Sequence, residues 1–297
     1  MTDAHRGALP SDGGWVRWMP GTFVLLWATG FIGARYGLPY AEPATFLLLR
    51  FALVVALLLP IAVVGGACWP PSRAQVVHLA VAGILVHGGY LGGVFSAIHA
   101  GMSAGVSALI VGLQPVLTAL AAAPLLGERV TARQWLGLAF GFGGVALVVG
   151  DRASLGGLSA YSLAMAVVAL VSITIGTVYQ KRFCGAFDLR TGAIIQFVAA
   201  GLALAPIAIA FEHAPVRWTG EFLFALAWLV IVLSIGAISL LALLIRRGAA
   251  TKVASLFYLV PAVTATIAFV LFGETLGPLA LAGFGVAVAG VALVVRA

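Results

Sequence analysis

The chain has 297 residues, of which 63% are hydrophobic and only 8% are charged, and its formal net charge is +7. That composition leaves too little polar surface for a soluble globular protein and predicts an integral membrane protein. The basic residues stand singly or in pairs between apolar segments, without the dense run of a nucleic-acid-binding module, so we expect no nucleic-acid partner.

Ten apolar segments follow one another, and their lengths of 18 to 25 residues favour all-α membrane spans over barrel strands. They cover residues 17–36, 43–64, 75–98, 103–126, 133–150, 158–180, 190–211, 221–245, 250–272 and 278–296. Residues 1–16 are polar and Gly-rich, without the apolar core of a cleaved signal peptide, and we expect them to form a cytoplasmic tail.

The Lys and Arg residues predict the orientation. With the N-terminus inside, twelve of the 16 lie in cytoplasmic loops and ends, three lie in outer loops, and Arg50 lies within a span. This bias predicts that both termini are cytoplasmic and that the chain is a multi-pass protein of the inner membrane. Cys68 and Cys184 then lie near the reducing side without metal-ligand spacing, so we expect no disulfide, no metal and no cofactor.

A segment over 103–149 recurs over 249–295, with 17 of 47 positions identical and no gap. At this offset of 146 positions, three residues of the first copy return in the second: Pro115, Gly127 and Glu128 become Pro261, Gly273 and Glu274. Such similarity indicates a duplication. Each predicted repeat, 17–150 and 158–297, holds five spans, so the second must be inverted, an architecture typical of secondary transporters.

Several short motifs resemble the EamA-type branch of the drug/metabolite transporter superfamily. They are Trp27 with Phe31, Leu49-Arg50-Phe51, and the stretch from Pro115 to Gly137 that contains Leu-Gly-Glu-Arg and Gln-Trp-Leu-Gly. The resemblance implies ten helices, with spans 1–4 and 6–9 around the substrate path and spans 5 and 10 at the periphery. It also implies export or exchange of small metabolites, often amino acids, as in the aromatic amino-acid exporters. The second half departs from the pattern, because Gln196 stands at the position of Arg50.

Pro115 and Pro261 fall near the middle of two spans, at equivalent positions of the repeat. A mid-helix proline lacks the backbone N–H and displaces the carbonyl four residues earlier. We therefore predict two hinges along the substrate path, the alternative being ordinary packed kinks.

Polar and aromatic side chains at mid-depth are the candidate substrate-binding residues, because polar groups in a bilayer face the bundle interior. They are Trp27, Arg50, His87, Tyr90, Gln114, Ser234 and Tyr258. Each has a structural alternative: His87 as a hydrogen-bonded packing residue, Arg50 as a side chain reaching the outer interface, and the rings as core. For Glu128 and Glu274, just beyond spans, we expect a structural role.

No Asp or Glu lies deep within a span, which favours a neutral, zwitterionic or anionic solute, with His87 as the candidate proton coupler. The predicted function is a secondary transporter that exports small metabolites, above all amino acids, including aromatic ones. One alternative is a nucleotide-sugar or lipid-intermediate carrier, although only Arg50 is available for phosphate. The other is an intramembrane enzyme, but the required carboxylate pairs and metal motifs are absent, so we expect no catalytic residues.

Two small-residue faces, Gly137-x-x-x-Gly141 and Gly283-x-x-x-Ala287, predict close helix packing within the bilayer. Such faces also suit a dimer surface, so the oligomeric state is either monomer or homodimer.

Overall fold

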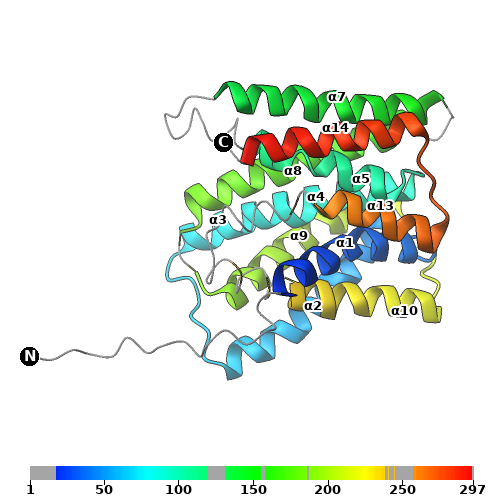
Figure 1. The fold of residues 1–297 in the computed structure, drawn as a ribbon. Helices are drawn as coiled ribbons and strands as arrows, with labels where there is room; N and C mark the ends of the chain where they lie inside the picture. Colours follow the sequence, from blue (N-terminus) through cyan, green and yellow to red (C-terminus); the bar gives the residue numbers. More distant parts are fainter. Residues whose placement is uncertain are drawn as a thin grey trace, which may run out of the picture.

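The computed structural model describes residues 18–118, 131–154, 158–185, 187–237 and 259–295, together with 240, 244 and 257. Within these ranges the regular secondary structure is helical, and the helices pack into one bundle (Figure 1). They are α1 (Met19–Gly37), α2 (Pro43–Val64), α3 (Arg73–Gly83), η2 (Ile84–Gly89), α4 (Tyr90–His99), α5 (Ala104–Val111), α7 (Ala132–Ser154), α8 (Ala160–Phe183), α9 (Leu189–Phe211), α10 (Gly220–Ala227), η3 (Trp228–Ala237), α13 (Leu259–Phe272) and α14 (Pro278–Val295).

Six helical segments of the described chain are long and apolar enough to cross a membrane. They are 43–64, 73–99, 132–151, 160–183, 189–211 and 220–237, and three shorter apolar helices accompany them. The chain is therefore an all-helical, multi-span membrane protein, as its composition predicts.

Helix ends follow local side-chain chemistry. Ser72, Ser103, Ser159 and Thr219 each accept a hydrogen bond from the backbone amide three residues further on. Thr131 and Gln134 form a capping box at the start of α7: the Thr131 amide donates to Gln134 Oε1 at 2.7 Å, and the Gln134 amide donates to Thr131 Oγ1 at 3.3 Å.

Gly273 ends α13 with φ +65°, a left-handed backbone that favours glycine. Its amide donates to Phe269 O at 3.0 Å. The equivalent Gly127 and Glu128 lie outside the described residues.

Both prolines lie close to helix starts rather than in mid-helix. α5 ends at Val111, residues 112–113 form a turn, and the chain is helical again from Gln114, so Pro115 occupies the first turn of the second piece. Pro261 lies in the first turn of α13. The physical reason is that a first-turn proline removes no intrahelical hydrogen bond, whereas a mid-helix proline does.

Two spans contain π-helical turns at matching places. η2 continues α3 into α4, and η3 continues α10. Shifted by the 146-residue offset, η2 falls on 230–235, inside η3. π-Helical turns are rare and concentrate at functional sites, and here they recur at equivalent positions of the 146-residue offset.

The predicted small-residue faces bring α7 and α14 together along one edge of the bundle, where the two helices run in opposite directions (Figure 1). A Cβ on Gly144 would collide with backbone atoms of Gly283 and Ala287, and a Cβ on Gly290 would meet the Gly137 carbonyl oxygen at 2.6 Å. Only glycine permits this approach of backbone to backbone.

α2 and α9 pack against each other and are joined beyond one end by two carboxylates. Glu212 accepts hydrogen bonds from the Ala44 and Thr45 amides, both at 2.7 Å, and so caps the first turn of α2. Glu42, which precedes α2, accepts from the Ala214 amide at 2.7 Å. The start of α2 is thus joined to the end of α9 and to the loop that follows it.

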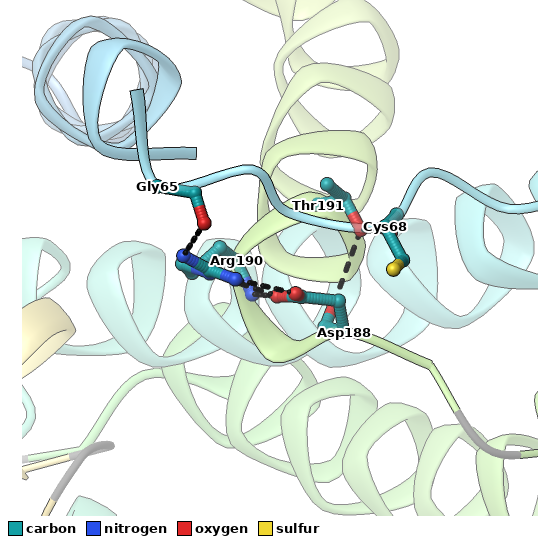
Figure 2. A network of polar contacts seen from close by, with 5 residues as sticks. All are labelled: Gly65, Cys68, Asp188, Arg190 and Thr191. Carbon is teal, nitrogen blue, oxygen red and sulfur yellow. Dashed lines mark hydrogen bonds and ion pairs between the residues drawn. The ribbon is translucent and has the colours of Figure 1, made fainter. Parts of the chain in front are cut away.

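At the opposite end the start of α9 binds the loop that follows α2 (Figure 2). Asp188 caps α9 by accepting from the Arg190 amide at 2.9 Å and forms an ion pair with its guanidinium at 2.7 Å, which holds the pKa of the Asp188 carboxyl below its usual range. Arg190 Nη1 donates to Gly65 O at 3.3 Å, and Thr191 Oγ1 donates to Cys68 O at 2.8 Å. Each of the two helices therefore binds the other at both ends.

Candidate functional site

A cavity of about 100 Å³ lies at the centre of the bundle, where α1, α2, η2, α4, α8, α9 and η3 meet. This volume is several times the roughly 10–15 Å³ that one water molecule needs. Its walls are mostly apolar, with three polar groups, Arg50, His87 and Tyr90; the remaining lining residues are Trp27, Gly30, Phe31, Val86, Leu91, Val94, Phe95, Ile173, Phe197 and Leu233. An apolar cavity with a few convergent polar groups is the usual form of a small-molecule site.

A smaller cavity of about 40 Å³ adjoins the central one, because both are lined by Trp27, Phe31, Tyr90 and Ile173. Both prolines line it, together with Gln114 and Phe257. The two predicted hinge residues thus face one shared space between α5 and α13. A Cβ on Gly112 would lie 3.0 Å from Pro261 Cγ, so the break after α5 fits against the start of α13.

Arg50 is 4% exposed, and its guanidinium crosses from α2 to η3. Nε and Nη2 donate to the hydroxyl oxygen of Ser234 at 3.2 and 3.0 Å, and that hydroxyl donates to Leu229 O at 2.9 Å. The side chain does not extend to the interface, which was the structural alternative. In the described part of the chain no carboxylate lies within ion-pair distance of this guanidinium.

His87 lies on η2, and its Nε2 is 3.2 Å from Gln196 Oε1 on α9. Phe197 stacks on the imidazole with ring centres 4.3 Å apart and planes inclined by 24°. A ring nitrogen bonded to an amide oxygen carries the proton, so this contact selects the tautomer with hydrogen on Nε2 when the ring is neutral. His87 is both hydrogen-bonded and part of the cavity wall.

These two polar contacts are related by the 146-residue offset. Gln196 is the counterpart of Arg50, and Ser234 comes one residue after the counterpart of His87. Arg50–Ser234 and His87–Gln196 therefore join α2 to η3 and α9 to η2 in matching ways. Phe51 and its counterpart Phe197 contact each other directly, with ring centres 5.3 Å apart.

The other predicted residues lie as follows. Gln114 Nε2 donates to Thr177 Oγ1 on α8 at 3.0 Å. Trp27 contacts Phe257 edge to face, with ring centres 5.1 Å apart. Ser234 does not line the cavity itself; it accepts a hydrogen bond from Arg50, which does line the cavity. Tyr258 lies outside the described residues.

Several cavity residues escaped the sequence prediction, among them Phe197, Ile173 and Leu233. In the sequence of a span, an apolar residue that lines a cavity looks the same as an apolar residue that packs against another helix. For Phe197 a signal existed, since it follows Gln196 as Phe51 follows Arg50.

Glu274 forms an ion pair with Arg35 Nε at 3.4 Å, and the guanidinium carbon of Arg35 lies 5.8 Å from the centre of the Phe272 ring. The pair joins the last turn of α1 to the second residue after α13, and neither residue lines the cavity.

Comparison with known proteins assigns this architecture. The model of the EamA-like transporter family matches twice, over residues 22–150 and 160–296. A probable terminal-alkyne amino-acid exporter of Streptantibioticus cattleyicolor is 30% identical over 280 residues, covering 92% of this chain and 91% of the relative. The uncharacterized inner membrane transporter YedA of Escherichia coli is 26% identical over 270 residues, covering 91% and 87%.

A probable amino-acid metabolite efflux pump of Salmonella typhimurium is 27% identical over 285 residues, covering 90% of each chain. One solved crystal structure superimposes with a TM-score of 0.63 at 22% identity, covering 93% of this chain and 94% of the other, and so shares the fold. The spans and these relatives identify a multi-pass inner-membrane protein whose class is transporter rather than enzyme. With both halves matched, the chain belongs to the EamA-like transporter family.

Proposed function

We propose that the protein is a secondary transporter that exports or exchanges small neutral or zwitterionic metabolites, above all amino acids, including aromatic ones. The observation that carries this proposal is the buried Arg50 guanidinium, which lines the central cavity and whose hydrogen-bond partner, among the residues that the structure describes, is the Ser234 hydroxyl. A buried cation without a carboxylate is costly unless a ligand supplies one. A substrate carboxylate fits this need, because it accepts two parallel hydrogen bonds from a guanidinium.

The remaining walls suit the rest of such a substrate. Trp27, Phe31, Phe95 and Phe197 offer apolar and aromatic surface to a side chain. His87 and Tyr90 line the same cavity and supply polar contacts for an amino group or a polar side chain. Phosphate-bearing substrates such as nucleotide sugars would need more cations than this cavity offers, so that carrier class is the weaker candidate.

The architecture behind this mechanism is ten spans in two inverted repeats, 17–150 and 158–297, with both termini cytoplasmic. Support comes from the paired features at the 146-residue offset: the two prolines, the two π-helical turns and the two polar contacts. The antiparallel course of the counterparts α7 and α14 also supports inversion (Figure 1). In this arrangement the cavity lies between the halves, where inverted-repeat transporters bind their substrates.

Alternating access would then turn on the helix break ahead of Pro115 and on the start of α13 at Pro261, because both prolines border the same small cavity. A break of this kind absorbs changes in backbone angles while the helical pieces on either side stay intact. His87 is the candidate proton coupler, because protonation would give its ring a second N–H donor and a positive charge while the Nε2–H bond to Gln196 is retained.

The test is uptake by purified protein in liposomes, with labelled aromatic, aliphatic and acidic amino acids and a labelled nucleotide sugar, each with and without a pH gradient. We expect saturable uptake of neutral amino acids with apolar side chains and no uptake of the nucleotide sugar. Exchange of the nucleotide sugar without transport of any amino acid would overturn the proposal. Dependence on the pH gradient would separate coupled transport from facilitated diffusion.

A further inference from the structure

A second hollow, the flank groove, lies on the side of the bundle away from the substrate cavity. It has a volume of about 500 Å³ and is bounded by the start of α2, by η2 and α4, by α8 and by α9. Its floor is the face of η2 and α4 opposite to His87 and Tyr90, and it consists of Gly88, Gly89, Gly92 and Gly93.

The glycine floor has two rows with different neighbours. A Cβ on Gly93 would lie 2.5 Å from Met165 O, and one on Gly89 would lie 2.5 Å from Ser172 Oγ, so this row allows α8 to pack closely. The row of Gly88 and Gly92 is less crowded, because a Cβ there would make ordinary van der Waals contact with Ala200 and Leu204 of α9, at 3.9 and 3.5 Å. Both glycines line the groove, so the second row forms a smooth floor without side chains.

The rims of the flank groove are apolar and exposed. Ile84 is 41% exposed, Val168 43%, Ile207 45% and Phe211 76%. On membrane spans such side chains face hydrocarbon, so the groove opens sideways to the lipid. From Ile84 to Ser96 it extends about 18 Å at roughly 1.5 Å per residue, close to half of a hydrocarbon core of about 30 Å. Its length thus matches one leaflet.

One end of the flank groove is polar. There α2 and α8 begin and α4 and α9 end, and the lining residues are Glu42, Ser96, His99, Tyr161 and Glu212. The two glutamates accept hydrogen bonds from backbone amides. Two carboxylates beside a histidine and a tyrosine favour a headgroup with an ammonium group as well as a phosphate, over a purely anionic one.

We propose that the flank groove binds one zwitterionic phospholipid, with an acyl chain along Gly88 and Gly92 and its ammonium group against Glu42 and Glu212. This proposal rests on the membrane location of the chain and does not depend on the transported solute.

The test is native mass spectrometry of the full chain after extraction from nanodiscs that contain equal amounts of phosphatidylethanolamine and phosphatidylglycerol. The wild type is expected to retain one phosphatidylethanolamine in preference to phosphatidylglycerol. Gly92→Leu fills the floor and should lose this lipid, and Phe211→Ala removes an exposed rim and should retain less. Gly143→Leu is the matched control, because nothing lies within 4 Å of its Cβ position on lipid-facing α7, and it should retain the lipid.

Each of the following results would overturn the proposal. The first is retention of the lipid that is the same in wild type and Gly92→Leu, and equally a wild type that shows no preference between the two lipids. The second is a wild-type dimer that Gly92→Leu converts to a monomer, since a second copy would then cover the groove. The third is displacement of the lipid by a transported amino acid, since the groove would then belong to the substrate path.

Discussion

Arg50 offers the sharpest test of how this protein recognises its solute. Replacement by lysine keeps a positive charge but removes the planar fork of N–H groups, and replacement by leucine removes the charge. In the present structure Nε and Nη2 both point at Ser234 Oγ, at 3.2 and 3.0 Å, so the fork already faces one acceptor. A bound carboxylate would take two such bonds in parallel.

The expected loss follows from the hydrogen bonds removed. A hydrogen bond to a charged group contributes about 1.5–3 kcal/mol, so the loss of one of two in Arg50→Lys should raise KM roughly 10- to 100-fold. Arg50→Leu should abolish saturable uptake. Its folded state should be as stable as the wild type or more stable, because a buried cation without a carboxylate partner is replaced by an apolar side chain.

Counterflow in liposomes gives KM and maximal rate, and thermal unfolding in detergent gives stability. Ser234→Ala is the control, since it removes the hydroxyl partner of Arg50 but leaves the guanidinium, and KM should change less than in Arg50→Lys. The reasoning is refuted if Arg50→Leu transports with wild-type KM. It is also refuted if Arg50→Leu unfolds at a much lower temperature, because Arg50 would then be a structural residue.

Two further predictions concern stability. In Gly144→Leu the new side chain collides with backbone atoms of α14, which should lower the free energy of unfolding by about 1–3 kcal/mol and lower the Tm. The neighbouring Gly143→Leu has no such collision and should leave the Tm unchanged. Equal Tm values for the two variants would contradict the tight packing of α7 and α14. Asp188→Ala removes the cap of α9 and should cost about 1 kcal/mol at neutral pH. Arg190 lowers the pKa of Asp188 in the folded state, so the stability that the Asp188 carboxylate contributes is complete above the usual aspartate pKa of about 3.9 and is lost as the pH falls through the lower folded pKa. The Tm difference between Asp188→Ala and wild type should therefore narrow only below about pH 4. A Tm difference that grows in acid would contradict this account.

Much of the helical framework was predictable from sequence, because its signals are local. The apolar stretch at 43–64 coincides with α2 from end to end, since Pro43 starts it and Gly65 follows it. The capping box at Thr131 and Gln134 and the glycine stop at Gly273 depend on neighbouring residues alone. The packing of α7 on α14 followed from the spacing of small residues, because only a face without side chains lets two backbones meet.

The site was only partly predictable, because its contacts join residues far apart in the chain. Arg50 and His87 could be singled out as deep ionisable groups, but their partners Ser234 and Gln196 lie 184 and 109 positions away. The π-helical turns leave no mark in the hydrophobic period, since those spans are apolar on nearly every side. The prolines were placed in mid-helix because the sequence does not show that the helix breaks at Gly112, ahead of Pro115.

The hydrogen bonds that join α2 and α9 at both ends limit how far these two helices can separate. If the helices separated at one end, the Ala44 and Thr45 amides would lose Glu212 as their hydrogen-bond acceptor. If they separated at the other end, Arg190 and Thr191 would lose their hydrogen bonds to the loop after α2. Either separation leaves polar backbone groups without partners at the edge of a medium that offers few substitutes. We therefore expect the two helices to move together, and a passage to either side of the membrane to open between other helices of the bundle.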